Sequence, residues 1–261
     1  MSGKVMLMWA GGKESALVYK KLVDAGYQVA KLCVLTDEGK GVYNNTLRGV
    51  RTQRNFIPIE VIQAQAAAIG VELVQISIAD ISSLREYYDS LAEWAQKCQQ
   101  VYSEFKTEGG THIAFGYFNS MCLESKNVGV VGLEPLYPLM GMIEEQIVDD
   151  FVTSGFKAKI IRTNRNLYGL EAMHHLCGCE WDANVRQEIR DNNISVIGED
   201  GSFGMICFDG PIYNTPLPIV YGEVLRFNVD EHMSTAKLSD MNAFNVLQVG
   251  ATRAFLQMSI Q

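Results

Sequence analysis

The stretch Trp9-Ala10-Gly11-Gly12-Lys13-Glu14-Ser15 lies between an apolar run, residues 5–8, and an amphipathic run, residues 16–25. This order predicts a strand, a glycine turn and a helix that follow one another with almost no connecting chain. Two glycines let a backbone pass close to a bulky anion, and a helix start offers N–H groups and the positive end of its dipole. Lys13 adds a mobile cation. The stretch therefore predicts a phosphate-binding loop, although an ordinary tight turn could contain the same residues.

The spacing excludes the two commonest phosphate-binding motifs. A Walker A loop has four residues between its first glycine and its Gly-Lys-Ser/Thr, and a dinucleotide fingerprint needs Gly-x-Gly-x-x-Gly. The stretch instead resembles the SGGxDS loop of the PP-loop ATP pyrophosphatases, with Ala10 for the leading serine and Glu14 for the aspartate. This resemblance implies that ATP is split between its α and β phosphates, usually to activate a carbonyl oxygen as an adenylate. Ala10 removes one hydroxyl from the loop.

A second resemblance lies far downstream, at Gly198-Glu199-Asp200-Gly201-Ser202-Phe203 and Phe208-Asp209-Gly210-Pro211-Ile212-Tyr213. These segments are similar to the signature GE-x-GE-[FY] … D-x-P-[LIF]-[FY] of the diphthine–ammonia ligase family. Four blocks between the two motifs also resemble that family in the same order, at residues 48–50, 64–70, 115–117 and 133–141. The similarity covers roughly the first four fifths of the chain.

Apolar runs with β-branched residues alternate with helical patterns through the first half of the chain. The strand-like runs are residues 5–8, 29–35, 72–78, 112–115 and, more weakly, 132–136; the helical patterns are 16–25, 59–69 and 83–105. This alternation predicts an α/β fold with a doubly wound parallel sheet of the Rossmann-like PP-loop kind. Ligands of such sheets lie at the carboxyl ends of the strands. The glycine loop, Thr36-Asp37 and Gly116-Tyr117 are expected at that edge.

The pattern changes after residue 141. A helix is expected at residues 142–152, a strand at 158–161 and a helix at 182–191, followed by mostly β-like sequence that includes 219–227 and 245–258. A chain of 261 residues suits one large domain or two smaller ones. We expect two, a PP-loop nucleotide-binding domain at 1–141 and a smaller C-terminal α+β substrate-binding domain at 142–261.

The charge balance argues against a nucleic-acid partner. The formal net charge is −8, and the longest basic run is the Lys20-Lys21 pair. No signal-peptide pattern and no apolar stretch long enough to span a bilayer is found, so we expect a cytoplasmic protein without a membrane partner. The sequence does not fix the oligomeric state, for which a homodimer is one candidate.

The first resemblance implies ATP and Mg²⁺ as cofactors. It assigns the nucleotide site to Ala10, Gly11, Gly12, Lys13, Glu14 and Ser15. Thr36 and Gly116 join this site through their expected place at the carboxyl edge, where Thr36 could contact adenine or ribose or be only structural. We expect backbone amides from the glycines, phosphate charge from Lys13, and a hydroxyl at the helix start from Ser15. Glu14 is a methylene longer than the family's aspartate. Its carboxylate could reach magnesium or a loop amide, or simply favour the first helical turn.

The second signature implies the acceptor chemistry. An incoming amine must lose a proton as it forms an amide, and acidic side chains could manage that proton or hold the acceptor. Glu199 retains the first acidic position and is a candidate catalytic residue, whereas Ser202 replaces the second glutamate. Further departures from the family pattern are Gly204, Tyr117, Arg48 and Met140. Because the departures concentrate on the acceptor side, we expect an acceptor other than the diphthine side chain.

Six cysteines without a signal peptide indicate reduced thiols rather than a disulfide framework. Cys33 and Cys207 fall in apolar runs, which favours a place in the core. The stretch His174-His175-Leu176-Cys177-Gly178-Cys179 holds four candidate zinc ligands, but so short a segment cannot easily surround one tetrahedral ion, and we expect no metal site there. A persulfide carrier needs an accessible low-pKa thiol, for which Cys122 is the candidate beside Cys177 and Cys179. Thiols without function are the simpler alternative.

Three functions follow from these features. The leading hypothesis is an ATP-dependent, AMP-forming ligase that adenylates a carbonyl and amidates it with ammonia. The alternative uses the same activation but delivers sulfur from a cysteine persulfide to give a thiocarbonyl. The third is a non-catalytic adenine-nucleotide sensor, which the lost acidic positions favour and the intact loop disfavours.

Overall fold

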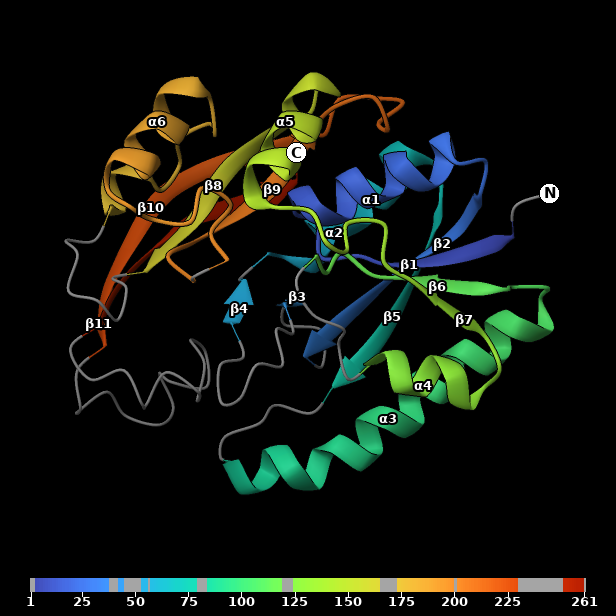
Figure 1. Ribbon diagram of the computed structural model, residues 1–261. Helices are drawn as coiled ribbons and strands as arrows, with labels where there is room; N and C mark the ends of the chain where they lie inside the picture. The colour runs from blue at the N-terminus through green and yellow to red at the C-terminus, as the bar shows by residue number, and fades with distance from the viewer. Residues whose placement is uncertain are drawn as a thin grey trace.

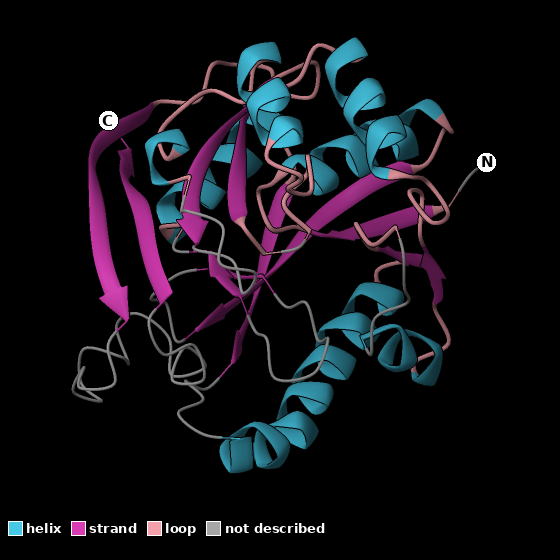
Figure 2. Cartoon of the chain, turned by 60° about the vertical axis from the view of Figure 1, so that its left-hand side comes forward, coloured by secondary structure: helices cyan, strands magenta, loops and turns pink. Residues whose placement is uncertain are grey.

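The computed structural model describes residues 3–37, 42–44, 53–55, 57–78, 84–118, 124–164, 173–199, 201–229 and 251–260. The protein has an α/β architecture in which a parallel sheet is joined to a second, antiparallel sheet (Figure 1). Seen from the side, the helices gather on opposite sides of the strands (Figure 2).

The larger sheet is built on parallel strands in the order β5-β2-β1-β6-β7. The bounds are Lys4–Met8 for β1, Gln28–Asp37 for β2, Glu72–Ile78 for β5, His112–Ala114 for β6 and Glu134–Leu136 for β7. The chain runs outward from β1 to β5, then crosses back to β6 and runs outward the other way. The expected doubly wound sheet is therefore confirmed, and its topological switch point lies between β1 and β6.

Helices cover both faces of this sheet. They are α1 (Lys13–Asp24), α2 (Ile59–Ile69), α3 (Leu84–Thr107) and α4 (Glu124–Val130). Successive side chains of a strand point to opposite faces, so β1 and β2 supply two cores. Val5, Leu7, Leu32 and Val34 pack on the side of α1 and α2, whereas Met6, Cys33 and Leu35 pack on the side of α3 and α4.

The strands after residue 141 form the antiparallel sheet, in the order β10-β11-β8-β9. The bounds are Lys157–Asn164 for β8, Phe203–Asp209 for β9, Ile219–Val229 for β10 and Ala251–Ile260 for β11. Three helical segments accompany it, α5 (Glu144–Thr153), the 3-10 turn η1 (His174–Leu176) and α6 (Ala183–Asp191).

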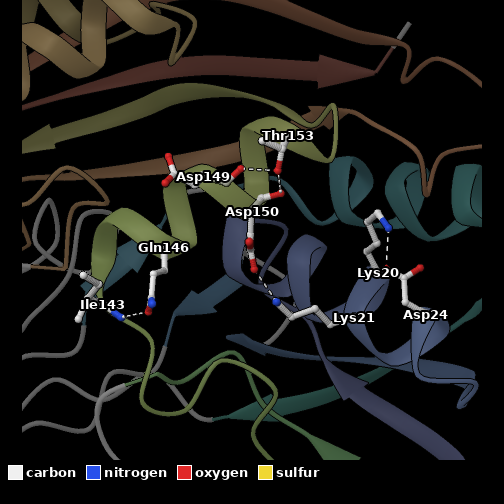
Figure 3. Close-up of polar contacts among 8 residues, drawn as sticks. All are labelled: Lys20, Lys21, Asp24, Ile143, Gln146, Asp149, Asp150 and Thr153. Carbon is white, nitrogen blue, oxygen red and sulfur yellow. Dashed lines mark hydrogen bonds and ion pairs between the residues drawn. The ribbon is translucent and has the colours of Figure 1, made fainter.

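Helices α1 and α5 lie side by side and join the two parts of the chain (Figure 3). The Lys21 ammonium donates to the Asp150 carboxylate at 2.5 Å. One hydrophobic core also extends across the expected boundary at residue 141, since Leu17 of α1 belongs to the same cluster as Ile160 of β8 and Ile206 of β9. The division into domains at 1–141 and 142–261 stays a prediction, which limited proteolysis would test.

The sequence missed some elements and misplaced one residue. It did not indicate the short antiparallel strands β3 (Val42–Asn44) and β4 (Gln53–Asn55), nor the helix α4. Strand β2 continues to Asp37, so Thr36 lies inside it rather than after it, and Thr36 pairs with Val42 on β3. Within the described ranges, no helix has both the length and the apolar character to cross a membrane.

Candidate functional site

The loop between β1 and α1 has the backbone geometry of an anion-binding turn. Gly11 takes a φ of +74°, a left-handed conformation that favours glycine, and Gly12 caps α1 with an extended backbone. The first helical bond runs from the Ala16 N–H to the Gly12 carbonyl at 3.2 Å. The N–H groups of the preceding residues have no acceptor in the previous turn of a helix, because that turn does not exist. They and the helix dipole suit a phosphate.

Space as well as conformation requires glycine at position 11. A Cβ built there would lie 2.6 Å from Ile62 Cδ1 and 2.7 Å from Gln65 Oε1. Both atoms belong to α2, so this helix packs directly against the loop. An alanine at position 11 would have both a strained backbone and a clash.

The polar side chains of the loop are folded in toward the protein. Lys13 is 5% exposed, and its ammonium forms an ion pair with the partly buried carboxylate of Glu14. The Ser15 hydroxyl donates to the Gly12 carbonyl at 3.1 Å. These side chains fit ATP and magnesium. Lys13 offers positive charge to a phosphate, and Glu14 offers a carboxylate oxygen, the ligand type that magnesium prefers. Ala10, next to Gly11, contributes no hydroxyl.

Gly116 packs against the first residues of α1. It follows β6, and a Cβ built there would lie 3.2 Å from Glu14 Cβ and 3.7 Å from the Ser15 nitrogen. The structure thus brings Gly116 and the start of α1 together. Thr36 is buried in β2, three residues beyond Cys33, whose carbonyl accepts from the Trp9 N–H at 2.7 Å. It therefore lies toward the same carboxyl edge of the sheet.

Strand β9 connects the second sequence motif to this loop. The Cys207 N–H donates to the Gly11 carbonyl at 2.9 Å. A Cβ on Gly12 would lie 3.4 Å from the Met205 carbonyl. The loop and the second motif begin about 190 residues apart in the printed sequence, and Met205 and Cys207, which lie between the two halves of that motif, bring β9 against the loop.

Glu199, the candidate acceptor-side acid, occupies the turn between α6 and β9. It is exposed, and its N–H donates to the Ser195 hydroxyl at 3.0 Å. That hydroxyl in turn donates to the two carboxylate oxygens of Glu144, at 2.9 and 3.0 Å. These bonds connect Glu199 to the start of α5. The contacts to the loop come instead from Met205 and Cys207 of β9.

The described cysteines divide into core residues and members of the His174–Cys179 segment. Cys33 and Cys207 are fully buried, as expected for core residues. Burial raises the pKa of the Cys33 thiol far above its usual range and raises the pKa of Cys207 to about 12, so both are poor nucleophiles. Cys177 is buried and Cys179 is partly exposed. The remaining candidate, Cys122, lies outside the described residues.

The side chains of the His174–Cys179 segment contact separate partners. His174 Nδ1 lies 2.8 Å from the Thr163 hydroxyl, and His175 Nε2 lies 2.5 Å from Glu188. The Cys179 thiol donates to the His175 carbonyl at 3.5 Å. Among the described residues, no group of three or more His, Cys, Asp or Glu side chains is arranged to hold a metal ion. The segment is used here as a folded connection between β8 and α6.

Sequence reasoning missed Gln65. It is fully buried in α2 and contacts both the loop and β9. Two signals were available: the block at residues 64–70 resembles the ligase family, and an amide stands in the run Ala64-Gln65-Ala66-Ala67-Ala68, where a buried helix face favours apolar residues.

Neither a protein-family model nor a curated protein matches the chain. Among solved structures, the chain is similar to a protein from Methanocaldococcus jannaschii that is described as a predicted subunit of tRNA methyltransferase. The two share 14% sequence identity with a TM-score of 0.42, over 78% of this chain and 96% of the other. Loop geometry, not overall similarity, therefore carries the functional assignment.

Proposed function

We propose that the protein is an ATP-dependent, AMP-forming ligase. In this proposal the loop at Gly11 to Ser15 binds the phosphates of ATP, and a substrate carbonyl oxygen attacks the α phosphate. Ammonia then displaces AMP and leaves an amide. The observation that carries the proposal is a glycine turn and helix start with a buried lysine, located at the topological switch point between β1 and β6.

The backbone amides of the loop, Lys13, Glu14 and Gly116 each have a physical role in the proposed reaction. Backbone N–H groups at the start of α1 would hold phosphate oxygens, and the Lys13 ammonium would offset charge that grows on them as pyrophosphate leaves. Magnesium would add charge and orient the phosphates. A bound phosphate would compete with Glu14 for Lys13, which frees the Glu14 carboxylate for the metal. Gly116, without a side chain, leaves room beside Glu14 and Ser15.

Glu199 is proposed as the acidic group on the acceptor side. Its exposure allows a proton to pass to solvent after the amine attacks. The acceptor is proposed to be a small molecule or a side chain with a carbonyl group, because the net charge of −8 disfavours a nucleic-acid substrate. Sulfur delivery remains the second candidate through Cys122, and nucleotide sensing the third.

The test is to incubate the protein with magnesium-ATP, a metabolite extract from its host, ¹⁵N-ammonium and a ³⁴S-labelled persulfide source, and to follow nucleotides and label by mass spectrometry. AMP with ¹⁵N in a metabolite supports the ligase. Entry of ³⁴S supports sulfur transfer, in which case one cysteine is indispensable. Binding of ATP without AMP in any extract supports a sensor and contradicts the ligase.

A matched pair of lysine variants tests the location of the site. Lys13→Ala removes the loop cation and should abolish AMP formation. Lys20→Ala removes a lysine from the same helix that pairs with Asp24 away from the loop (Figure 3), and should leave turnover unchanged. Normal turnover in Lys13→Ala would contradict the placement of ATP at this loop.

A further inference from the structure

The Gln65 side chain is a fully buried amide whose hydrogen bonds go to residues 9–11, to β9 and to Tyr213 just after β9. Its Nε2 donates to the Gly11 carbonyl at 3.1 Å and to the Cys207 carbonyl at 2.7 Å. Its Oε1 accepts from the Trp9 indole N–H at 2.9 Å. Two carbonyls require donors and an indole requires an acceptor, so these partners fix which end of the amide is nitrogen.

These bonds determine the direction of one peptide group in the loop. The Gly11 carbonyl accepts from both Gln65 Nε2 and the Cys207 N–H, which holds it toward α2 and β9. In a trans peptide the carbonyl and the next N–H point to opposite sides. Fixing the Gly11 carbonyl therefore points the Gly12 N–H away from α2 and β9.

The same amide joins the loop to the segment after β9. Tyr213 donates its hydroxyl to the Cys207 carbonyl at 3.1 Å, beside the Gln65 bond to that oxygen. The network joins three separate stretches of the chain, which contain Trp9 and Gly11, then Gln65, then Cys207 and Tyr213. Burying an amide in an apolar core is costly unless its bonds are made, so this network resists rearrangement as a unit.

We propose that Gln65 is a positioning residue for the phosphate site, which holds the Gly12 N–H in the direction needed to bind a phosphate oxygen. This inference rests on the proposed function, since it requires that the loop binds phosphate. Gln65 does not touch the phosphate itself. It acts through the Gly11–Gly12 peptide, and its role should therefore appear in phosphate binding and not in binding of the nucleoside.

The experiment compares Gln65→Met, which keeps the length of the side chain but removes its donors, with the wild-type protein. Calorimetry measures affinity for inorganic pyrophosphate, magnesium-ATP and adenosine. Loss of the aligned peptide should weaken pyrophosphate and ATP about tenfold and leave adenosine unchanged. General damage to the fold would weaken all three ligands alike.

Two further variants of α2 control for the position and for lost stability. Gln63→Met changes an exposed glutamine two residues away, and Ile69→Val thins the core at the far end of the helix. Both should bind pyrophosphate like the wild type. If Gln65→Met does not fold, Trp9→Phe removes the donor to Gln65 Oε1 and should weaken pyrophosphate about threefold relative to adenosine.

The outcomes separate this inference from the proposed function. A wild-type protein that binds neither pyrophosphate nor ATP overturns the proposed function and this inference with it. Wild-type binding together with equal pyrophosphate affinity in Gln65→Met overturns the positioning role alone. Selective loss of phosphate ligands supports both.

Discussion

The loop at residues 9–15, which we propose to bind phosphate, and the His174–Cys179 segment are both short connections next to a strand, but they differ in residue type. The loop contains two glycines and a single hydroxyl side chain, whereas the other segment contains two histidines and two cysteines. By residue reactivity the second is the better candidate for a site. In the structure its side chains serve to hold a turn between β8 and α6.

The two segments differ in how their backbone N–H and carbonyl groups are hydrogen-bonded. At the loop, the Gly11 carbonyl is fixed by two donors and helix α1 begins one residue after Gly12, so backbone N–H groups gather at one point. In the other segment, the backbone pairs with β8, through the Gly178 N–H to the Ile160 carbonyl at 2.7 Å and the Ile160 N–H to the Cys179 carbonyl at 2.9 Å. Backbone geometry, more than side-chain type, therefore distinguishes the loop that we propose to bind phosphate from the His174–Cys179 segment.

The largest effect is expected for Gly11→Ala. The left-handed backbone and the contacts below 3 Å to Ile62 and Gln65 should together cost about 2–4 kcal/mol of unfolding free energy. Nucleotide binding should be lost as well. Denaturant unfolding and calorimetry measure the two effects.

Gly141→Ala is the matched control for that variant. Gly141 has a φ of +83°, but nothing lies within 4 Å of its Cβ position. Only the backbone cost of about 1 kcal/mol remains. Equal destabilisation by the two variants would show that the packing of α2 on the loop contributes little.

A second effect should come from Gly116→Ala. Its Cβ would press on Glu14 at 3.2 Å without a left-handed backbone, so the start of α1 must shift by a few tenths of an ångström. We expect pyrophosphate affinity to fall about threefold with little change in unfolding free energy. Gly129→Ala, on the open side of α4, is the control. Unchanged affinity in Gly116→Ala would mean that β6 does not shape the site.

Thiol reactivity separates the core cysteines from the partly exposed one. Because the pKa of Cys207 is about 12, its thiol stays protonated at pH values at which an exposed thiol loses its proton. Iodoacetamide at pH 8 should modify Cys179 and leave Cys33 and Cys207 unmodified in the folded protein. The unfolded chain loses the Cys207 proton near pH 9 and the folded protein only near 12, so this group lowers stability as pH rises between them. Rapid labelling of Cys207, read by peptide mass spectrometry, would contradict its burial.

The smallest effect is expected for Cys179→Ser. The thiol is partly exposed and makes one weak bond to the His175 carbonyl, so unfolding free energy should change by less than about 0.5 kcal/mol. Added zinc should not shift the melting temperature of the wild type or the variant. AMP formation should persist in the variant. Its loss would move the His174–Cys179 segment from a structural role to sulfur chemistry.

Sequence pattern predicted the parallel sheet and its principal helices because both faces of β1 and β2 are buried and the intervening helices are strongly patterned. It predicted a glycine turn between β1 and α1 because an apolar run and an amphipathic run flank the two glycines with almost no connecting chain. It could not predict β9 beside Gly11, since a contact between segments so far apart in the sequence leaves no local periodicity. The role of Gln65 could not be predicted for a related reason. Its hydrogen-bond partners are remote in the sequence, and only the folded structure brings them together.

The most direct test of the central assignment is to titrate protein labelled with ¹⁵N-glycine with magnesium-ATP and to follow the assigned amide resonances. Saturable shifts at Gly11, Gly12 and Gly116, absent in Lys13→Ala, are the predicted result. ATP binding that shifts other glycines and leaves these three unchanged would place the nucleotide elsewhere and contradict the account.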